Sequence, residues 1–177
     1  NTVVLKPSSD SPTIAAKFME IVEEVGLPAG VVNFISGSAA TGEAMVTSPK
    51  TRFISFTGSK GVGLHINEEA AKTRPGQIWI KRVVAEMGGK DAIVVADDAD
   101  LDSAATGIVQ AAFGFQGQKC SACSRLIVDE KVHDELVEKV VALTKKLKVG
   151  QPTEGDTNVS AVINKRSFDN TLRYIDT

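Results

Sequence analysis

The chain has 177 residues, of which 42% are hydrophobic and 24% charged, the balance of an ordinary globular protein. Because 20 Lys and Arg stand against 22 Asp and Glu, no basic excess exists to bind nucleic acid or an acidic membrane. No apolar run has the length of a membrane span, and two cysteines are too few for a disulfide framework. We therefore expect a reducing, cytoplasmic environment.

The first half of the chain alternates short apolar runs with helical periodicity. Strands are predicted at 2–5, 31–35 and 53–56, where β-branched and aromatic residues gather. Helices are predicted over 14–25, shortly after 42, and from the glycines after 58 to about 72. Strands that alternate with helices predict a parallel sheet with crossover helices.

The second half continues the pattern. Strands are predicted at 78–84, 92–95 and 126–128, helices over 101–112 and 132–147, and a loop over 151–158. The last residues form an amphipathic pattern in which Phe168, Leu172 and Ile175 fall at helical spacing. Since domains usually end in polar, frayed segments, we expect the chain to be the middle of a longer protein.

The segment FTGSKGVG, residues 56–63, ends a predicted strand and opens a predicted helix. Its glycines permit a tight turn, and the N–H groups at the helix start favour an anion such as a pyrophosphate. Thr57 and Ser59 add hydroxyl donors. The segment lacks the G-x-G-x-x-G fingerprint, so this motif alone favours an ordinary glycine turn.

Lys6 and Glu86 each allow two interpretations. Lys6 ends the first predicted strand, where open α/β sheets bind ligands, although a solvated lysine is commoner there. Glu86 precedes Gly88 and Gly89, which let the backbone approach another group closely, so its carboxylate suits a general base. A loop glutamate beside a turn explains the same residues, and spacing does not choose between the two.

Cys120 lies in GFQGQKCSACSR, a polar segment after a predicted helix, where Lys119 and Arg125 are the local cations that favour a thiolate. Cys120 and Cys123 form a C-x-x-C pair. Zinc would need further ligands, and nothing in the sequence places either histidine nearby. A redox dithiol would normally follow a strand. We therefore predict that Cys120 is a nucleophile and that no metal is bound.

Four segments in this order, KPSSDSP, FTGSKGVG, EMGGK and GQKCSACSR, resemble the NAD(P)-dependent aldehyde dehydrogenase superfamily over essentially the whole chain. GFQGQKCSACSR and WIKRVVAEMGGKD are most similar to its 1-pyrroline-5-carboxylate dehydrogenase branch, which oxidises glutamate γ-semialdehyde to glutamate in proline and arginine degradation. The resemblance implies an α/β fold: residues 1–87 would belong to a Rossmann-like, parallel NAD-binding domain, and 88–177 to an α/β catalytic domain. It also implies a small aldehyde substrate and a homo-oligomer at full length.

The resemblance also implies roles for individual residues. Cys120 matches the catalytic nucleophile, Glu86 the general base, and Ser121 a position that helps to anchor the substrate carboxylate. Cofactor contacts are expected at Lys6, Ser9, Thr57, Gly58, Ser59, Gly63, Met87 and Gly88. Relatives often carry a glutamate in place of Ser9. Because that carboxylate would repel a 2′-phosphate, Ser9 leaves NADP as an alternative to NAD.

The implied chemistry is an attack of the Cys120 thiolate on the aldehyde, hydride transfer to NAD, and hydrolysis of the thioester by water that Glu86 activates. The family's oxyanion asparagine would lie before Asn1 and its ribose-binding glutamate after Thr177. We therefore expect little or no activity from the chain alone. Two alternatives stay open: an aldehyde dehydrogenase with another substrate range, and a redox or zinc module built on the C-x-x-C pair.

Overall fold

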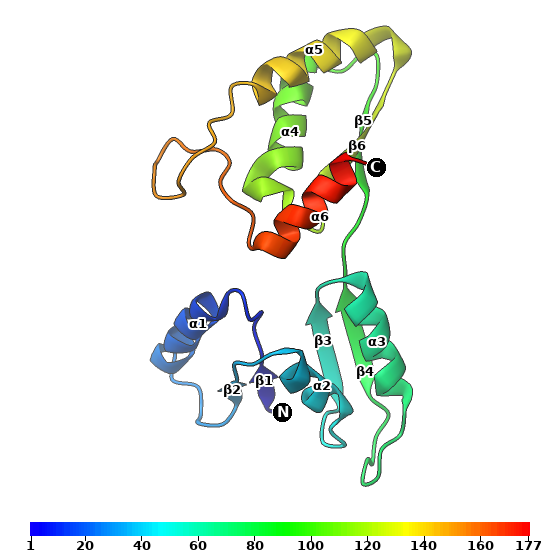
Figure 1. Ribbon diagram of the computed structural model, residues 1–177. Helices are drawn as coiled ribbons and strands as arrows, with labels where there is room; N and C mark the ends of the chain where they lie inside the picture. The colour runs from blue at the N-terminus through cyan, green and yellow to red at the C-terminus, as the bar shows by residue number, and fades with distance from the viewer. The chain divides into compact units, whose positions relative to one another are not determined.

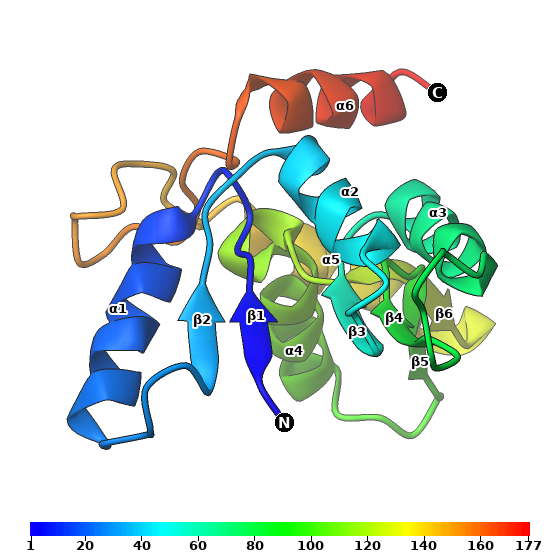
Figure 2. The ribbon, with the colours of Figure 1, turned by 90° about the horizontal axis from the view of Figure 1, so that it is seen from below.

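The computed structural model describes residues 1–177, which form two compact units, Asn1–Glu86 and Met87–Thr177. In both units strands are followed by helices along the chain (Figures 1 and 2). Every strand pair is parallel, which confirms the α/β class predicted from the alternation of strands and helices.

The first unit consists of four strands and three helices. The strands are β1 (Val3–Leu5), β2 (Val32–Phe34), β3 (Phe53–Thr57) and β4 (Arg82–Glu86). The helices are α1 (Pro12–Glu24), α2 (Ala39–Thr47) and α3 (Lys60–Ala71). Its buried apolar residues come from the two helices that contact each other, Val46 on α2 and Ile66 and Ala70 on α3.

The alternation of strands and helices had suggested one parallel sheet. The strands of this unit instead form separate pairs. β1 pairs with β2, and β3 pairs with β4, so each pair is a separate two-stranded sheet. β1 and β3 therefore each keep one edge without a hydrogen-bonded neighbour. Apolar side chains on these strands are about half exposed: Val3 at 52%, Val4 at 51% and Phe53 at 56%.

The second unit packs helices against a third parallel pair, β5 (Asp91–Val95) and β6 (Cys123–Val128). These helices are α4 (Leu101–Phe113) and α5 (His133–Thr144). The unit also has α6 (Lys165–Ile175), which buries none of its residues, and short 3₁₀ turns at Gly114–Gly117 and Glu130–Val132. Figure 1 shows α4 and α5 side by side. Leu136 on α5 is completely buried against this core, which stabilises the unit by about 1.5–3 kcal/mol.

The predicted strand at 78–84 begins too early, because β4 starts only at Arg82. The burial of residues 78–81 does alternate along the chain. Ile78 and Ile80 are 82% and 88% exposed, however, whereas Lys81 is buried. The Lys81 ammonium donates a 2.6 Å hydrogen bond to the carbonyl oxygen of Val46 on α2. Burial, and to a smaller extent the charge of Arg74, lowers the pKa of Lys81. Lys81 is thus the buried side chain of this segment, and the two isoleucines are exposed.

Several other element boundaries differ from the prediction. β6 begins at Cys123, three residues before the predicted strand at 126–128. β5 begins at Asp91, one residue early, and α5 ends at Thr144 rather than near Leu147. Glu86 is the last residue of β4, where a loop had been expected. The helix predicted over 101–112 is confirmed as α4.

An exposed ion pair joins α3 to α2 and predicts a pH-dependent stability. His65 Nε2 lies 2.8 Å from Glu43 Oε2, and this hydrogen bond, with the charge of Glu43, raises the pKa of His65. Because the folded pKa lies above the unfolded value of about 6.5, the pair stabilises fully below that pH and loses its effect as pH rises through the folded pKa. Wild type should therefore exceed His65→Gln in urea midpoint at acidic pH, with the difference vanishing at alkaline pH.

Glu43→Gln is the matched control, since it removes the partner and leaves the histidine. It should abolish the same pH-dependent difference, and adding His65→Gln to it should change nothing further. A difference between wild type and His65→Gln that stays constant with pH would contradict the assignment.

Candidate active site

The turn between β3 and α3 contains the predicted anion site. Ser59 caps α3, its Oγ accepting from the Val62 N–H at 3.5 Å. A Cβ on Gly58 would stand 2.5 Å from the Phe56 ring, so a larger residue at this position would displace that ring. The first N–H groups of α3 have no partner within the helix. No atom lies within 4 Å of a Cβ built on Gly61, in the first turn of α3.

Lys6 follows β1 at its carboxyl end and is half-buried. Its ammonium donates to the carbonyl oxygens of Pro7 at 2.7 Å and Gly37 at 3.3 Å. These bonds hold the lysine against the loop between β2 and α2. Ser9 lies exposed in the turn after Lys6.

Glu86 stands at the carboxyl end of β4, directly beside the β3–α3 turn. Thr57 is its partner in the β3–β4 register, and the Gly58 N–H donates to the Glu86 carbonyl oxygen at 3.0 Å. The Glu86 residue is exposed. The first unit therefore brings together Thr57, Gly58 and Glu86, which sequence reasoning had assigned to two separate motifs.

Cys120 lies in an exposed turn of the second unit, closed by a 3.2 Å hydrogen bond from the Ala122 N–H to the Lys119 carbonyl oxygen. This polar segment, which allowed either a loop or the start of a helix, is therefore a turn. The backbone of Gly89 packs against this turn: a Cβ there would lie 3.2 Å from the Cys120 carbonyl oxygen and would overlap the Asp91 carboxylate. The Cys120 turn and the two-glycine segment are therefore in contact, and a side chain at position 89 would displace both the Asp91 carboxylate and the Cys120 carbonyl.

A β-bulge follows the Cys120 turn. Asp91 pairs with Cys123 and Ala92 with Arg125, so Ser124 is an extra residue in β6. The Arg125 guanidinium donates through Nε to the Lys90 carbonyl oxygen at 2.9 Å, which ties β6 to the segment after Gly89. Cys123 Sγ contacts the Arg125 carbonyl oxygen at 3.3 Å, and neither cysteine is in a disulfide.

The backbone just before Cys120 is strained. Phe115 and Gln116 have φ values of 55° and 57°, and Gly117 follows at 68°. Left-handed backbone costs a non-glycine residue about 1–2 kcal/mol, so two such residues in succession need support from their surroundings. Nothing in the sequence predicts this turn, because neither phenylalanine nor glutamine favours positive φ.

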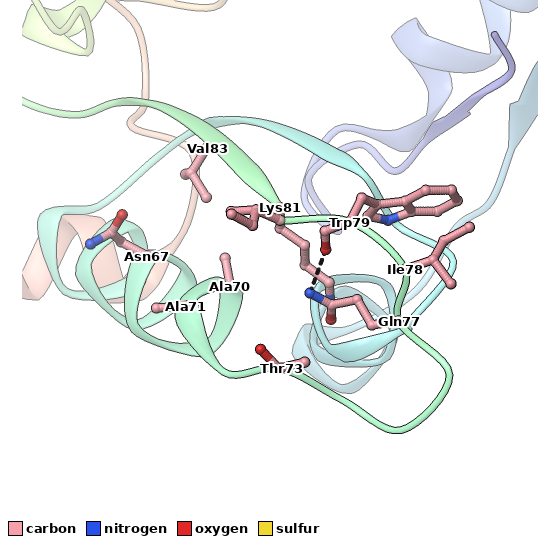
Figure 3. Close-up of a pocket in the computed structure, with 10 residues that line it drawn as sticks. Asn67, Ala70, Ala71, Thr73, Gln77, Ile78, Trp79, Lys81 and Val83 are labelled. Carbon is pink, nitrogen blue, oxygen red and sulfur yellow. Dashed lines mark hydrogen bonds between the residues drawn. The ribbon is translucent and has the colours of Figure 1, made fainter.

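A cavity of about 670 Å³ in the first unit lies elsewhere (Figure 3). It is open to solvent between α3 and the segment that precedes β4, where the Gln77 amide donates to the Trp79 carbonyl oxygen at 2.8 Å. This position is at the amino end of β4, whereas open parallel sheets bind ligands beyond their carboxyl ends. We therefore place the candidate site at Glu86 and the β3–α3 turn, and not in the cavity at the amino end of β4.

The structure holds no group of three or more His, Cys, Asp or Glu side chains arranged for a metal ion. His65 and His133 instead pair with Glu43 and Asp134, each at 2.8 Å. None of the helices has both the length and the apolar character needed to cross a membrane.

Comparison with known proteins identifies the family. The model of the aldehyde dehydrogenase family matches residues 1–177. The chain belongs to the aldehyde dehydrogenase family. A 1-pyrroline-5-carboxylate dehydrogenase of Bacillus cytotoxicus is 58% identical over 176 residues, covering 99% of this chain and 34% of the relative. The enzyme of that name from Geobacillus kaustophilus is 58% identical over 177 residues, with the same coverage.

The aldehyde dehydrogenase fold is confirmed by solved structures. The crystal structure of a Thermus 1-pyrroline-5-carboxylate dehydrogenase with bound NAD superposes with a TM-score of 0.95 at 46% identity. The match covers 99% of this chain and 34% of that enzyme. The chain thus spans about a third of the length of the relatives it matches.

Three residues shape the surroundings of Cys120 through contacts that the sequence did not predict. Gly89 contacts its carbonyl oxygen, Arg125 anchors the strand that follows it, and Gln118 accepts a hydrogen bond from the Ile163 N–H at 3.0 Å. Gly89 and Arg125 stood within motifs already singled out. The contacts of all three join residues far apart in sequence, so spacing gave no signal for them.

Proposed function

We propose that the protein oxidises glutamate γ-semialdehyde to glutamate with NAD, as a 1-pyrroline-5-carboxylate dehydrogenase of proline and arginine degradation. The observation that carries this proposal is the exposed Cys120 turn packed on Gly89, which only Met87 and Gly88 separate from Glu86 in sequence. The identity of 58% to relatives of that name supports the substrate.

In this proposal the Cys120 thiolate attacks the aldehyde carbon and forms a thiohemiacetal. The Cys120 N–H, which donates no hydrogen bond in the structure, is available to stabilise the oxyanion. NAD, held by the residues of the β3–α3 turn, would supply the oxidising power as the acceptor of a hydride. Glu86 then removes a proton from water, which attacks the thioester, releases the acid and regenerates the thiol.

Residues of the β3–α3 turn fit a dinucleotide. The N–H groups at the start of α3 suit a pyrophosphate, with Thr57, Gly58, Ser59 and Gly63 around them. We assign the ribose contact to Lys6 and Ser9, and the contacts beside the nicotinamide to Met87 and Gly88. Residues 1–87 would then belong to the NAD-binding domain and 88–177 to the catalytic domain. Ser9 leaves NADP as the alternative cofactor.

Ser121, exposed next to Cys120, is assigned to the substrate carboxylate. The substrate that we propose for the site is accordingly a small aldehyde with a carboxylate at its other end. We further propose that the full-length protein is cytoplasmic and assembles as a homo-oligomer.

The proposal is tested with the full-length protein by comparing NADH formation from glutamate γ-semialdehyde and from a simple aliphatic aldehyde of similar length. We expect a higher kcat/KM for glutamate γ-semialdehyde, and a loss of this preference in Ser121→Ala with the aliphatic rate retained. Preference for the aliphatic aldehyde would overturn the specific substrate and leave an aldehyde dehydrogenase of other range.

The close packing of Gly89 predicts a further effect on turnover. In Gly89→Ala the Asp91 carboxylate can rotate away, but the Cys120 carbonyl belongs to the backbone and must move with its turn. Displacing the nucleophile by a fraction of an ångström should lower kcat roughly tenfold. Gly155→Ala is the control, since no atom lies within 4 Å of its added Cβ. Equal kcat values for the two variants would contradict the prediction.

A further inference from the structure

Two glutamine side chains hold the strained turn that leads to Cys120. Gln118 Oε1 accepts a 3.0 Å hydrogen bond from the Ile163 N–H, 45 residues further along the chain. With its amide oxygen toward the same segment, Gln116 accepts from the Ser160 N–H at 2.8 Å. The Gln118 N–H also donates to the Phe115 carbonyl oxygen at 3.0 Å, which closes the turn.

The segment that donates these hydrogen bonds, residues 160–163, is itself anchored at both ends. Val159 bridges to Val149, and its carbonyl oxygen accepts from the Gly150 N–H at 3.0 Å. At the other end Asn164 caps α6, and its side chain accepts a hydrogen bond from the Ser167 N–H at 2.8 Å. Residues 160–163 therefore offer a fixed row of donors against which the turn can rest.

Strained backbone persists only where its surroundings over-determine it. Phe115 is 67% exposed, so burial of its side chain does not hold the left-handed conformation. The two glutamine bonds are the long-range polar contacts of this turn. Gln118 is also only two residues from Cys120, so a displacement of its side chain passes directly to the nucleophile.

We propose that Gln118 is a positioning residue, whose side-chain oxygen, bound to the Ile163 N–H, sets the place of the Cys120 sulfur. The inference rests on the proposed function, in which Cys120 is the nucleophile. The contribution that we assign to Gln118 is an acceptor at a fixed reach. Its amide Nε2 makes only long contacts, at 3.4 Å to the Phe115 carbonyl oxygen and 3.5 Å to Gln116 Oε1, so the bond from the Ile163 N–H is the stronger restraint.

The test compares three variants of the full-length protein. Gln118→Met removes the acceptor at similar size, Gln118→Asn shortens its reach by one methylene, and Gln118→Glu keeps an acceptor that takes the same N–H. We expect kcat to fall roughly ten- to hundredfold in Gln118→Met and Gln118→Asn. Gln118→Glu should stay within about threefold of wild type. KM for NAD and the thermal midpoint should not change in any of the three.

The exposed loop residue Gln151 provides the control, because its side chain makes no hydrogen bond and Gln151→Met should behave as wild type. Wild-type kcat in Gln118→Asn overturns the inference, as does an equal loss in Gln118→Glu or a midpoint that falls together with kcat. If Gln118→Met fails to fold, the pair Asn and Glu decides. Activity retained in Cys120→Ser would instead overturn the proposed function itself.

Discussion

Replacing Cys120 by serine should lower kcat for aldehyde oxidation at least about a thousandfold in the full-length protein, since removal of a nucleophile is among the most damaging active-site changes. A serine hydroxyl at neutral pH is almost entirely protonated, and no histidine partners this position to activate it. The fold should be unaffected because the Cys120 side chain is exposed and makes no hydrogen bond.

Cys123→Ser is the matched control, because Cys123 lies three residues after Cys120, at the start of β6. Cys123 Sγ contacts only a backbone carbonyl, and a serine hydroxyl can donate to the same oxygen. We expect unchanged kcat in this variant, and labelling of Cys120 alone when wild type is treated with a substrate-like electrophile and analysed by mass spectrometry. Equal losses in both variants, or stoichiometric zinc that disappears in Cys123→Ser, would favour the C-x-x-C module instead.

Glu86→Gln should separate the two halves of the reaction. The amide has nearly the shape of the carboxylate but does not accept a proton from water, so steady-state turnover should fall about 10²–10⁴-fold. Attack by Cys120 and the redox step do not need this base in the proposed mechanism. A burst of NADH equal to the number of sites should therefore precede the slow steady state.

Rapid mixing measures the burst, and mass spectrometry of the quenched protein should show an acyl group on Cys120. Glu138→Gln, an exposed glutamate on α5, serves as the control and should leave both phases unchanged. Loss of the burst itself would mean that Glu86 acts before the thioester forms, and would overturn its assignment to hydrolysis.

Periodicity predicted most elements because they follow local rules. α4 has an apolar face at helical spacing, and Asp100 caps it by accepting from the N–H groups of Asp102 and Ser103 at 3.0 and 3.1 Å. The backbone hydrogen bond from Ser103 is the main reason that the pKa of Asp100 is lowered. Local pattern failed at residues 78–81, where the alternation is present but Lys81 faces inward. That choice depends on the Val46 carbonyl, 35 residues away.

The candidate site divides in the same manner. Its candidate reactive residues each stand in a motif of characteristic letters, and their roles stay predictions. Glu86, Gly58 and Thr57 do lie together at one strand end. The supports of Cys120 were not predictable. Gly89 contacts it across 31 positions and Gln118 rests on Ile163 across 45, and such contacts exist only once the second unit has folded.

The unpaired edges of β1 and β3 have a consequence for handling the 177-residue chain. Each edge offers free backbone donors and acceptors beside half-exposed Val3, Val4 or Phe53, the combination that templates addition of strands from other molecules. The chain on its own should therefore aggregate with rising concentration. A lysine in place of Val3 or Phe53 should delay this, since charge on an edge strand opposes pairing between copies.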